Sequence, residues 1–193
     1  MTKVYPAVKS VFLLIYVLII CGCGTMMAKM EANKIETDPG TRTIAQRVDD
    51  QSIETKAIVN VHDSDKEYDK CHVVVVSYNG FVLLAGQVAS EELRIRAAKV
   101  IREIPTVKHV YNELEIAAPS SKMTRTSDAW ITTKIKSKLL ANPDIPGLRV
   151  KVVTENGIVF LLGLLNSEEA KRVGEISSEV KGVQRIVQLF ETI

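Results

Sequence analysis

The stretch R-V-K-V-V-T-E-N-G-I-V-F-L-L-G-L-L-N-S-E-E, from Arg149 to Glu169, repeats a pattern found earlier from His72 to Glu92, H-V-V-V-V-S-Y-N-G-F-V-L-L-A-G-Q-V-A-S-E-E. In each copy, two runs of β-branched and apolar residues flank the dipeptide Asn-Gly. Asn-Gly favours a type I′ turn because both central positions of that turn need a positive φ angle. Each copy therefore predicts a β-hairpin, with its turn at Asn79-Gly80 or at Asn156-Gly157.

Four glycines recur at matching places in the two copies. Gly80 and Gly157 complete the turns, and Gly86 and Gly163 follow six residues later inside the second strand. A glycine inside a strand is normally unfavourable, so close approach of a helix or of another backbone segment is expected there. We interpret these four residues as structural positions.

The residues around the hairpins complete a repeated unit. Ser90 and Ser167 are each expected to cap a helix, because each precedes two glutamates that suit the positive end of a helix dipole. Apolar periodicity adds a helix before each hairpin and a strand after each capped helix. These added elements are the helices Ile53 to Val61 and Trp130 to Ala141 and the strands Val107 to Ile116 and Val183 to Thr192. The sequence therefore predicts an α+β protein of two tandem domains, each ordered helix, strand, strand, helix, strand.

The repeats set the expected domain boundaries. The first domain covers residues 47–116 and the second covers residues 127–193. The segment 117–126, which contains proline and serine, is expected to be a linker. Residues 23–46 are polar and small, with a turn sequence at Asp38-Pro39-Gly40 and no sustained periodicity, which predicts a flexible tether.

Residues 1–22 are expected to be a lipoprotein signal peptide. Lys3 and Lys9 precede an apolar run that is too short to span a bilayer. The sequence Ile20-Cys21-Gly22-Cys23 resembles the bacterial lipobox, which makes Cys23 the expected lipid attachment site. A glycine follows Cys23 in place of the aspartate associated with inner-membrane retention, so the resemblance implies a lipid-anchored outer-membrane protein of a Gram-negative bacterium. The alternative is an ordinary cleaved signal that leaves Cys23 as a free thiol.

Charge argues against one class of partner and distinguishes the two domains. Without residues 1–22, the chain has 23 basic and 23 acidic side chains. This balance argues against nucleic acid, whose binding needs a sizeable basic patch. The first domain has 9 basic and 12 acidic side chains, a net charge of −3, whereas the second has 9 and 8, a net charge of +1. An anionic membrane would attract the second domain and repel the first.

The segment from Ser127 to Ala141 predicts a helix with two apolar sides. One side has the spacing of a stripe that packs on a core, and its residues are Ile131, Ile135 and Leu139. The other side carries the only tryptophan of the chain and several cations; its residues are Trp130, Leu140, Lys134, Lys136 and Lys138. Ser127 or Asp128 is expected to cap the first turn. This pattern favours contact with a membrane interface, and the alternative is that Trp130 covers the neighbouring domain.

These features together resemble the BON domain family (bacterial OsmY and nodulation). The likeness is carried by R-V-D-D-Q-S-I-E (Arg47 to Glu54), W-I-T-T-K-I-K-S-K-L-L (Trp130 to Leu140) and T-E-N-G-I-V-F-L-L-G-L (Thr154 to Leu164). The resemblance implies that two helices cover a small three-stranded mixed sheet in each domain. It also implies an outer-membrane lipoprotein, acylated by chains such as palmitate, that faces the periplasm, supports envelope integrity and stress response, and concentrates at the cell division site.

The resemblance further implies that the first helix of the second domain binds anionic phospholipid, either phosphatidylglycerol or cardiolipin. It adds Thr133 and Ser137 as headgroup contacts. The expected phospholipid-binding residues are therefore Trp130, Thr133, Lys134, Ser137, Lys138 and Leu140.

An enzyme is the class that the sequence supports least. The three histidines have no metal-ligand spacing, and there is no glycine-rich phosphate loop. The acidic run Asp63 to Asp69 lacks the glycine and the glutamate of a calcium loop, because Tyr68 and Val74 occupy those positions. We expect no catalytic residue, no cofactor and no bound metal.

A protein-interaction scaffold remains the alternative. The acidic first domain lacks the tryptophan, and an exposed strand edge in it would accept a partner such as the outer-membrane β-barrel assembly machinery. In this interpretation Trp130 lies at a domain or partner interface.

Overall fold

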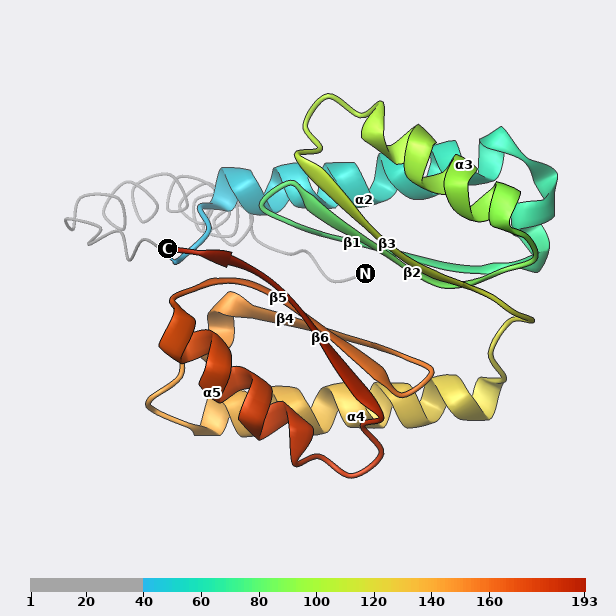
Figure 1. Ribbon diagram of the computed structural model, residues 1–193. Helices are drawn as coiled ribbons and strands as arrows, with labels where there is room; N and C mark the ends of the chain where they lie inside the picture. Colours follow the sequence, from blue (N-terminus) through green and yellow to red (C-terminus); the bar gives the residue numbers. More distant parts are fainter. Residues whose placement is uncertain (1–39) are drawn as a thin grey trace, which may run out of the picture. The chain divides into compact units, whose positions relative to one another are not determined.

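A computed structural model describes residues 40–193 of the chain. The expected signal peptide 1–22, the lipid attachment site Cys23 and the expected tether up to residue 39 lie outside the described residues. Two domains follow one another in the described part, and each has the predicted order of elements (Figure 1).

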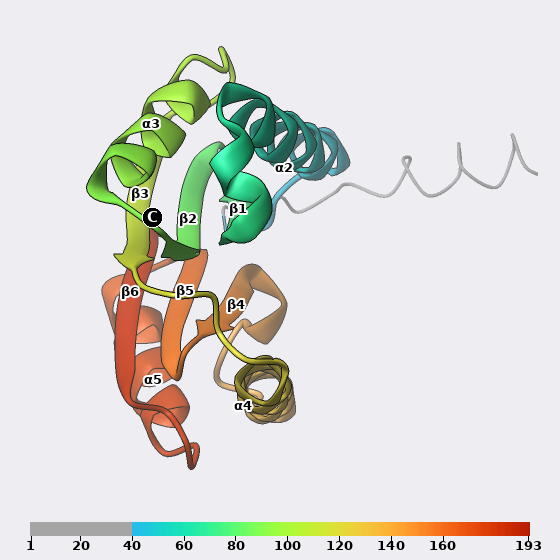
Figure 2. The same cartoon turned by 90° about the vertical axis from the view of Figure 1, so that its right-hand side faces the viewer.

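The first domain begins with a long helix and ends with a strand. Its elements are helix α2 (Ile44–Ser64), a 3₁₀ helix (Lys66–Lys70), strands β1 (His72–Tyr78) and β2 (Phe81–Val88), helix α3 (Glu91–Arg102) and strand β3 (His109–Ile116). Both helices lie on the same face of the sheet (Figure 2).

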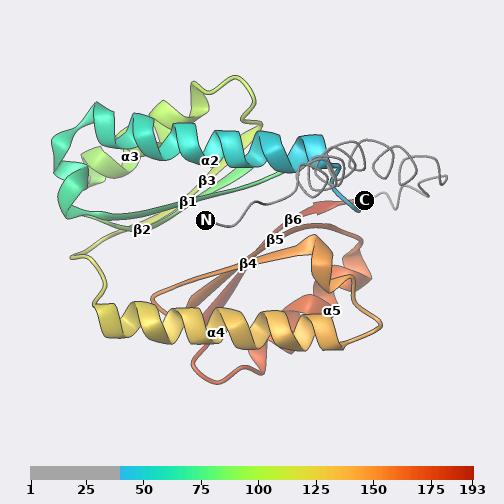
Figure 3. The same ribbon diagram turned by 180° about the vertical axis from the view of Figure 1, so that it is seen from behind.

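The second domain repeats this order. Its elements are helix α4 (Lys122–Ala141), a 3₁₀ helix (Gly147–Arg149), strands β4 (Val150–Glu155) and β5 (Ile158–Leu165), helix α5 (Ser167–Ser178) and strand β6 (Arg185–Thr192). Helix α4 runs along the sheet beside β4 (Figure 3).

The two sheets have the same topology. Each has its hairpin's second strand in the centre, in the orders β1-β2-β3 and β4-β5-β6. The hairpin strands pair antiparallel, and the last strand pairs parallel with the central one. This is the small three-stranded mixed sheet covered by two helices that the family resemblance implies, so the α+β prediction is confirmed.

Each domain has its own apolar core between its sheet and its helices. A third cluster of buried residues combines the opposite faces of the two sheets; it contains Val76, Tyr78, Leu83, Ala85, Phe160 and Leu162. Because both faces of the central strands are covered, β2 and β5 read as nearly continuous apolar runs instead of alternating.

The first helix of each domain starts earlier than its apolar stripe suggests. Helix α2 starts at Ile44, nine residues before Ile53, and Thr43 and Gln46 form a capping box at its N-terminus. Helix α4 starts at Lys122, where the Ser121 side chain accepts a hydrogen bond from the backbone N–H of Thr124. The added turns carry no buried apolar stripe, so periodicity did not detect them. The expectation that Ser127 or Asp128 caps α4 is therefore wrong.

One cap differs between the domains. Ser90 caps α3 as predicted, but α5 is capped by Asn166 and not by Ser167. The Asn166 side chain accepts hydrogen bonds from the backbone N–H groups of Glu168 and Glu169. The connection from strand to helix is one residue shorter in the second domain, so aligning the copies on their hairpins misplaces the cap.

The turn glycines have the positive φ that their turns need, and the strand glycines lie where backbone approaches backbone. Asn156 has φ 51° and Gly157 has φ 75°, the left-handed pair that a type I′ turn requires. At Gly86, where φ is 110°, an added Cβ would overlap the carbonyl oxygen of His72 on the neighbouring strand. At Gly163 an added Cβ would lie 2.7 Å from the carbonyl oxygen of Arg149.

Candidate functional site

Helix α4 docks on the second core by one side. Ile131, Ile135 and Leu139 are each at most 2% exposed. They belong to the cluster that also contains the central strand β5. The predicted stripe therefore anchors the helix and leaves its other side outward.

An exposed apolar stripe follows the outward side of α4. Trp130 is 49% exposed, Leu140 is 58% exposed and Met123 is 84% exposed. Met123 and Trp130 are seven residues apart, so they lie only about 20° apart around the helix. Sequence reasoning missed Met123 because the helix was not expected to start before Ser127, whereas it starts at Lys122. Leu140 lies about 80° around the helix from Trp130, so the stripe is a broad outward side, and it is about 26 Å long from Met123 to Leu140.

The structure leaves Trp130 outward and does not bury it against the first domain. The buried cluster between the sheets does not include Trp130. Its indole ring is instead approached by Lys134, whose Nζ lies 5.6 Å from the ring centroid. A lysine over an indole face is attracted by the ring's quadrupole, which keeps this cation beside the tryptophan.

The other predicted cations of α4 differ in their surroundings. Lys138 Nζ lies 2.9 Å from Oε2 of Glu179, the residue that follows α5. This cation therefore already has a carboxylate partner. Both side chains are largely exposed, and a surface pair of this kind is weak. Lys136 is exposed as well. Lys134 and Lys136 therefore carry most of the available positive charge.

Two hydroxyls lie on the same outward side. The Thr133 hydroxyl donates to the carbonyl of Ala129 at 2.8 Å, and the Ser137 hydroxyl donates to the carbonyl of Thr133 at 2.9 Å. Each oxygen keeps acceptor capacity toward solvent. All six predicted phospholipid-binding residues are thus on the exposed part of one helix.

Asp128, which the sequence suggested as a helix cap, has another role: it positions α4. Asp128 is buried and accepts hydrogen bonds from the backbone N–H groups of Asn156 and Gly157, both at 2.9 Å. The carboxylate thereby ties α4 to the hairpin turn. Asp50 makes the same two bonds to the first turn. The signal was present in the sequence, because Asp50 and Asp128 coincide when the first helices are superposed on Lys56 and Lys134.

Hydrogen bonding sets the charge state of the first of these aspartates. Burial by itself would raise the pKa of Asp50, but hydrogen bonds from Ser77, Gly80 and Asn79 and from Arg42 lower it below its ordinary value. The carboxylate therefore stays ionised while it holds the turn.

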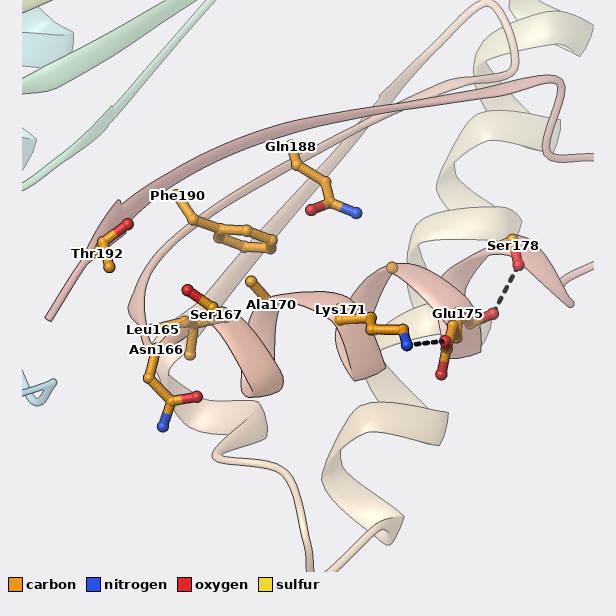
Figure 4. A pocket seen from close by; sticks show the side chains of 11 residues that line it. Leu165, Asn166, Ser167, Ala170, Lys171, Glu175, Ser178, Gln188, Phe190 and Thr192 are labelled. Atoms are coloured by element: carbon orange, nitrogen blue, oxygen red, sulfur yellow. Dashed lines mark hydrogen bonds and ion pairs between the residues drawn. The ribbon is translucent and has the colours of Figure 1, made fainter.

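A cavity lies between α5 and the edge strand β6, away from α4. It has a volume of about 660 Å³ and is lined by residues that include Phe190 and Gln188 on β6 and Lys171 and Glu175 on α5 (Figure 4). Lys171 and Glu175 pair with each other at 3.9 Å. The Ser178 hydroxyl at this cavity donates to the backbone carbonyl of Glu175 at 2.7 Å. Within residues 40–193 no group of three or more metal-ligating side chains occurs.

No helix among residues 40–193 combines the length and the apolar character needed to cross a bilayer.

These features define a class of protein: two tandem small α+β domains, the second with an outward-facing amphipathic helix. Residues 49–118 and 127–192 each match the BON domain, and the chain belongs to the BON domain family. The family expected from the sequence is thereby confirmed.

Three named proteins are similar to this chain and show which kind of BON protein it is. The chain is 35% identical over 161 residues to the outer membrane lipoprotein DolP of Haemophilus influenzae, covering 83% of this chain and 82% of that protein. It is 34% identical over 152 residues to the 21 kDa hemolysin of Actinobacillus pleuropneumoniae, covering 79% and 78%. It is 30% identical over 162 residues to the osmotically-inducible protein Y of Escherichia coli, covering 81% and 79%. The chain is a DolP-like outer-membrane lipoprotein with two BON domains.

Proposed function

We propose that this lipoprotein binds anionic phospholipid through α4 and thereby supports the integrity of the outer membrane, with a role at the division site. The observation that carries the proposal is the outward stripe of Met123, Trp130 and Leu140 on a helix whose opposite side is docked in the core. A tryptophan at a membrane interface is favourable because its ring is mostly apolar while its N–H is polar.

Charge supports the second domain as the one that binds anionic lipid. Each lysine near an anionic surface contributes on the order of 1 kcal/mol. Lys134 and Lys136 are available, whereas Lys138 has to leave Glu179 before it contributes fully. Together with the apolar stripe, this supports a reversible contact of a few kcal/mol.

A lipid on Cys23 would keep the protein at the membrane, so that even a weak contact of α4 could select between lipids. An acyl chain contributes about 0.8 kcal/mol for each buried methylene, which keeps the protein at a bilayer. The tether then holds α4 at a high effective concentration near lipid. In this mechanism the anchor localises the protein, and α4 distinguishes anionic from zwitterionic patches.

The proposal is tested with the soluble form that lacks residues 1–23. Its only tryptophan reports on α4, so its emission is titrated with vesicles of phosphatidylglycerol or cardiolipin and with purely zwitterionic vesicles. We expect a blue shift only with the anionic vesicles, weakening as salt is added, and no signal from Trp130→Phe. Lys134→Glu should weaken binding, whereas Lys56→Glu at the matching position of the first domain should not.

The absence of any shift, with circular dichroism showing a folded protein, would contradict lipid binding by α4. The second candidate function, a protein-interaction scaffold, would then gain. The observation that favours it is that β3, in the described residues, pairs with β2 alone and so leaves one strand edge for a partner such as the β-barrel assembly machinery.

A further inference from the structure

Strand β6 leaves one edge of the second sheet open. Within residues 40–193 it pairs with β5 and with no other strand. It is eight residues long and contains neither proline nor lysine, two residues that commonly protect such an edge. The cavity between α5 and β6 lies beside it, with Gln188 and Phe190 in its wall (Figure 4). The edge therefore offers backbone hydrogen-bonding groups next to a partly apolar groove.

The sequence of β6 is complementary to itself. When a second copy is laid antiparallel with Gln188 opposite Gln188, each residue faces the one at the same distance on the other side of the centre. In this register the opposed pairs are Arg185–Glu191, Ile186–Phe190 and Val187–Leu189. Opposite charges therefore meet at both ends and apolar side chains meet between them, and cross-strand pairs of these kinds stabilise antiparallel strands.

The apolar pairs also share the correct faces of the sheet. Ile186 and Phe190 pack against the core beneath the helices, whereas Val187 and Leu189 pack against the cluster between the two sheets. Side chains that are directly opposite in an antiparallel pair point to the same face. Each apolar pair would therefore continue a layer that already exists within one copy.

The two charged residues of β6 are suited to such a pair. Arg185 is exposed, and across residues 40–193 its side chain makes no hydrogen bond or ion pair. Glu191 accepts hydrogen bonds from the Asn79 amide at 3.0 and 3.3 Å, and this neutral partner leaves its charge uncompensated. A guanidinium from a second copy would supply the missing charge, and two-fold symmetry would repeat the pair.

The matching strand of the first domain lacks this complementarity. Asn112 in β3 corresponds to Gln188, because each pairs with the matching leucine of its central strand. Glu113 and Glu115 are also in β3, which contains no lysine or arginine. Pairing two copies of β3 about Asn112 would gather these carboxylates from both copies without a basic side chain in either strand. The carboxylates protect the edge of the first domain, whereas the one carboxylate of β6 would face an arginine.

We propose that β6 is an interface for a second copy of this chain, which pairs with it edge to edge, antiparallel and two-fold symmetric about Gln188. Pairing joins two three-stranded sheets into one sheet of six strands. Helix α4 lies beside β4, at the other edge of the sheet, so its outward stripe stays uncovered and each pair of chains carries two such helices. The interface goes beyond the lipid binding proposed above and does not depend on it.

The test exchanges the two charges in the form that lacks residues 1–23, which keeps both apolar cores. Sedimentation equilibrium measures self-association, and we expect a monomer–dimer equilibrium for the unaltered sequence. Arg185→Glu alone and Glu191→Arg alone should each weaken the dimer about tenfold, because like charges then meet at both ends. An equimolar mixture of the two variants should restore the dimer, since each chain meets the opposite charge of the other.

The mixture also separates the interface from an effect on folding. Glu191→Arg loses the hydrogen bonds from Asn79, and mixing does not return them. Restoration therefore reports on the contact between copies. Circular dichroism of each variant checks that it is folded before the two are mixed.

A cysteine at the centre of the interface provides a second readout. The form that lacks residues 1–23 has Cys71 as its only thiol, so the Cys71→Ser background isolates an added one. Gln188→Cys places a thiol opposite its own copy, and mild oxidation should link two chains. Asn112→Cys, at the matching position of β3, is the control and should not link them.

Each remaining outcome would count against the interface. A single monomeric species up to millimolar concentration would overturn the proposal. A dimer that both charge variants leave unchanged, or that Asn112→Cys links in place of Gln188→Cys, would place the contact elsewhere and overturn β6 as its site. A mixture of the two charge variants that stays monomeric would overturn the register. Vesicle binding by α4 is measured separately, so its failure is distinguishable from these results.

Discussion

The two domains share one framework and differ in what their first helices present to the outside. Helices α2 and α4 both use a buried aspartate to hold an Asn-Gly turn, and both lie beside the first strand of their hairpin, β1 or β4. On the outward side, the place of Trp130 is taken by Ser52 in the first domain. The comparison teaches that the framework is set by residues facing inward, and that a copy can gain or lose a binding surface without disturbing it.

The strand glycines are the strongest way to break the framework. Gly86→Ala should cost about 3 kcal/mol or more, because the positive φ is strained for alanine and its Cβ overlaps a backbone carbonyl. Gly163→Ala should cost about 1–2 kcal/mol, because the contact there is longer and φ is not positive. Urea denaturation measures both. An equal loss of stability for the two variants would contradict this difference between the domains.

Exchanging the residues at the matching positions 130 and 52 tests whether the outward side of α4 binds lipid. Trp130→Ser should weaken binding to anionic vesicles about tenfold, or about 1.4 kcal/mol, while the free energy of unfolding changes little because the side chain is half exposed. Vesicle co-sedimentation measures the affinity. Ser52→Trp in the Trp130→Ser background should not restore binding, since the first domain carries a net charge of −3. Restoration would show that tryptophan alone suffices.

A titratable contact joins the two domains. His72 Nε2 lies 3.2 Å from Glu155 Oε2. Burial raises the pKa of Glu155 to about 7; the nearby carboxylates of Asp128 and Glu115 add to the rise, and Arg125 opposes it. Folding thus favours the protonated form of Glu155. Its contribution to stability is present near its ordinary pKa of 4.5 and is lost as the pH rises through about 7.

We therefore expect Glu155→Gln to be stabilising by on the order of 1 kcal/mol at pH 8 and to have little effect at pH 5. The measurement is urea denaturation at the two pH values. His72 acts in the opposite sense, because burial lowers its pKa and its contribution is lost as the pH falls. His72→Gln in both backgrounds separates the two contributions. A Glu155→Gln effect that does not change with pH would contradict the assignment.

The smallest expected effect on lipid binding concerns Lys138, which already pairs with Glu179. Glu179→Gln should release Lys138 and strengthen binding to anionic vesicles about twofold, as expected for a surface ion pair worth a few tenths of a kcal/mol. Glu175→Gln, which releases Lys171 on the far side of α5, serves as the control. Stronger binding from both variants alike would show a general effect of net charge.

Much of the fold was accessible from the sequence because its signals are local. The Asn-Gly turns, the strand glycines and the buried stripe of α4 each depend on residues close together in the chain, and the structure has them at the expected places. The helix starts and the Asn166 cap were missed for a related reason. Turns without a buried stripe have no periodic signal, and a connection shortened by one residue shifts the alignment of the repeat.

The sequence by itself determined the repeated α+β unit, the family, the loss of the tryptophan in one copy and the outward side of α4. Only the tertiary structure decided that Asp128 holds the turn, that Lys138 faces Glu179 and that His72 meets Glu155. The physical reason is distance along the chain. Periodicity and turn preference arise from neighbouring residues, whereas these contacts join residues far apart in sequence and exist only once the helices have packed on their sheets.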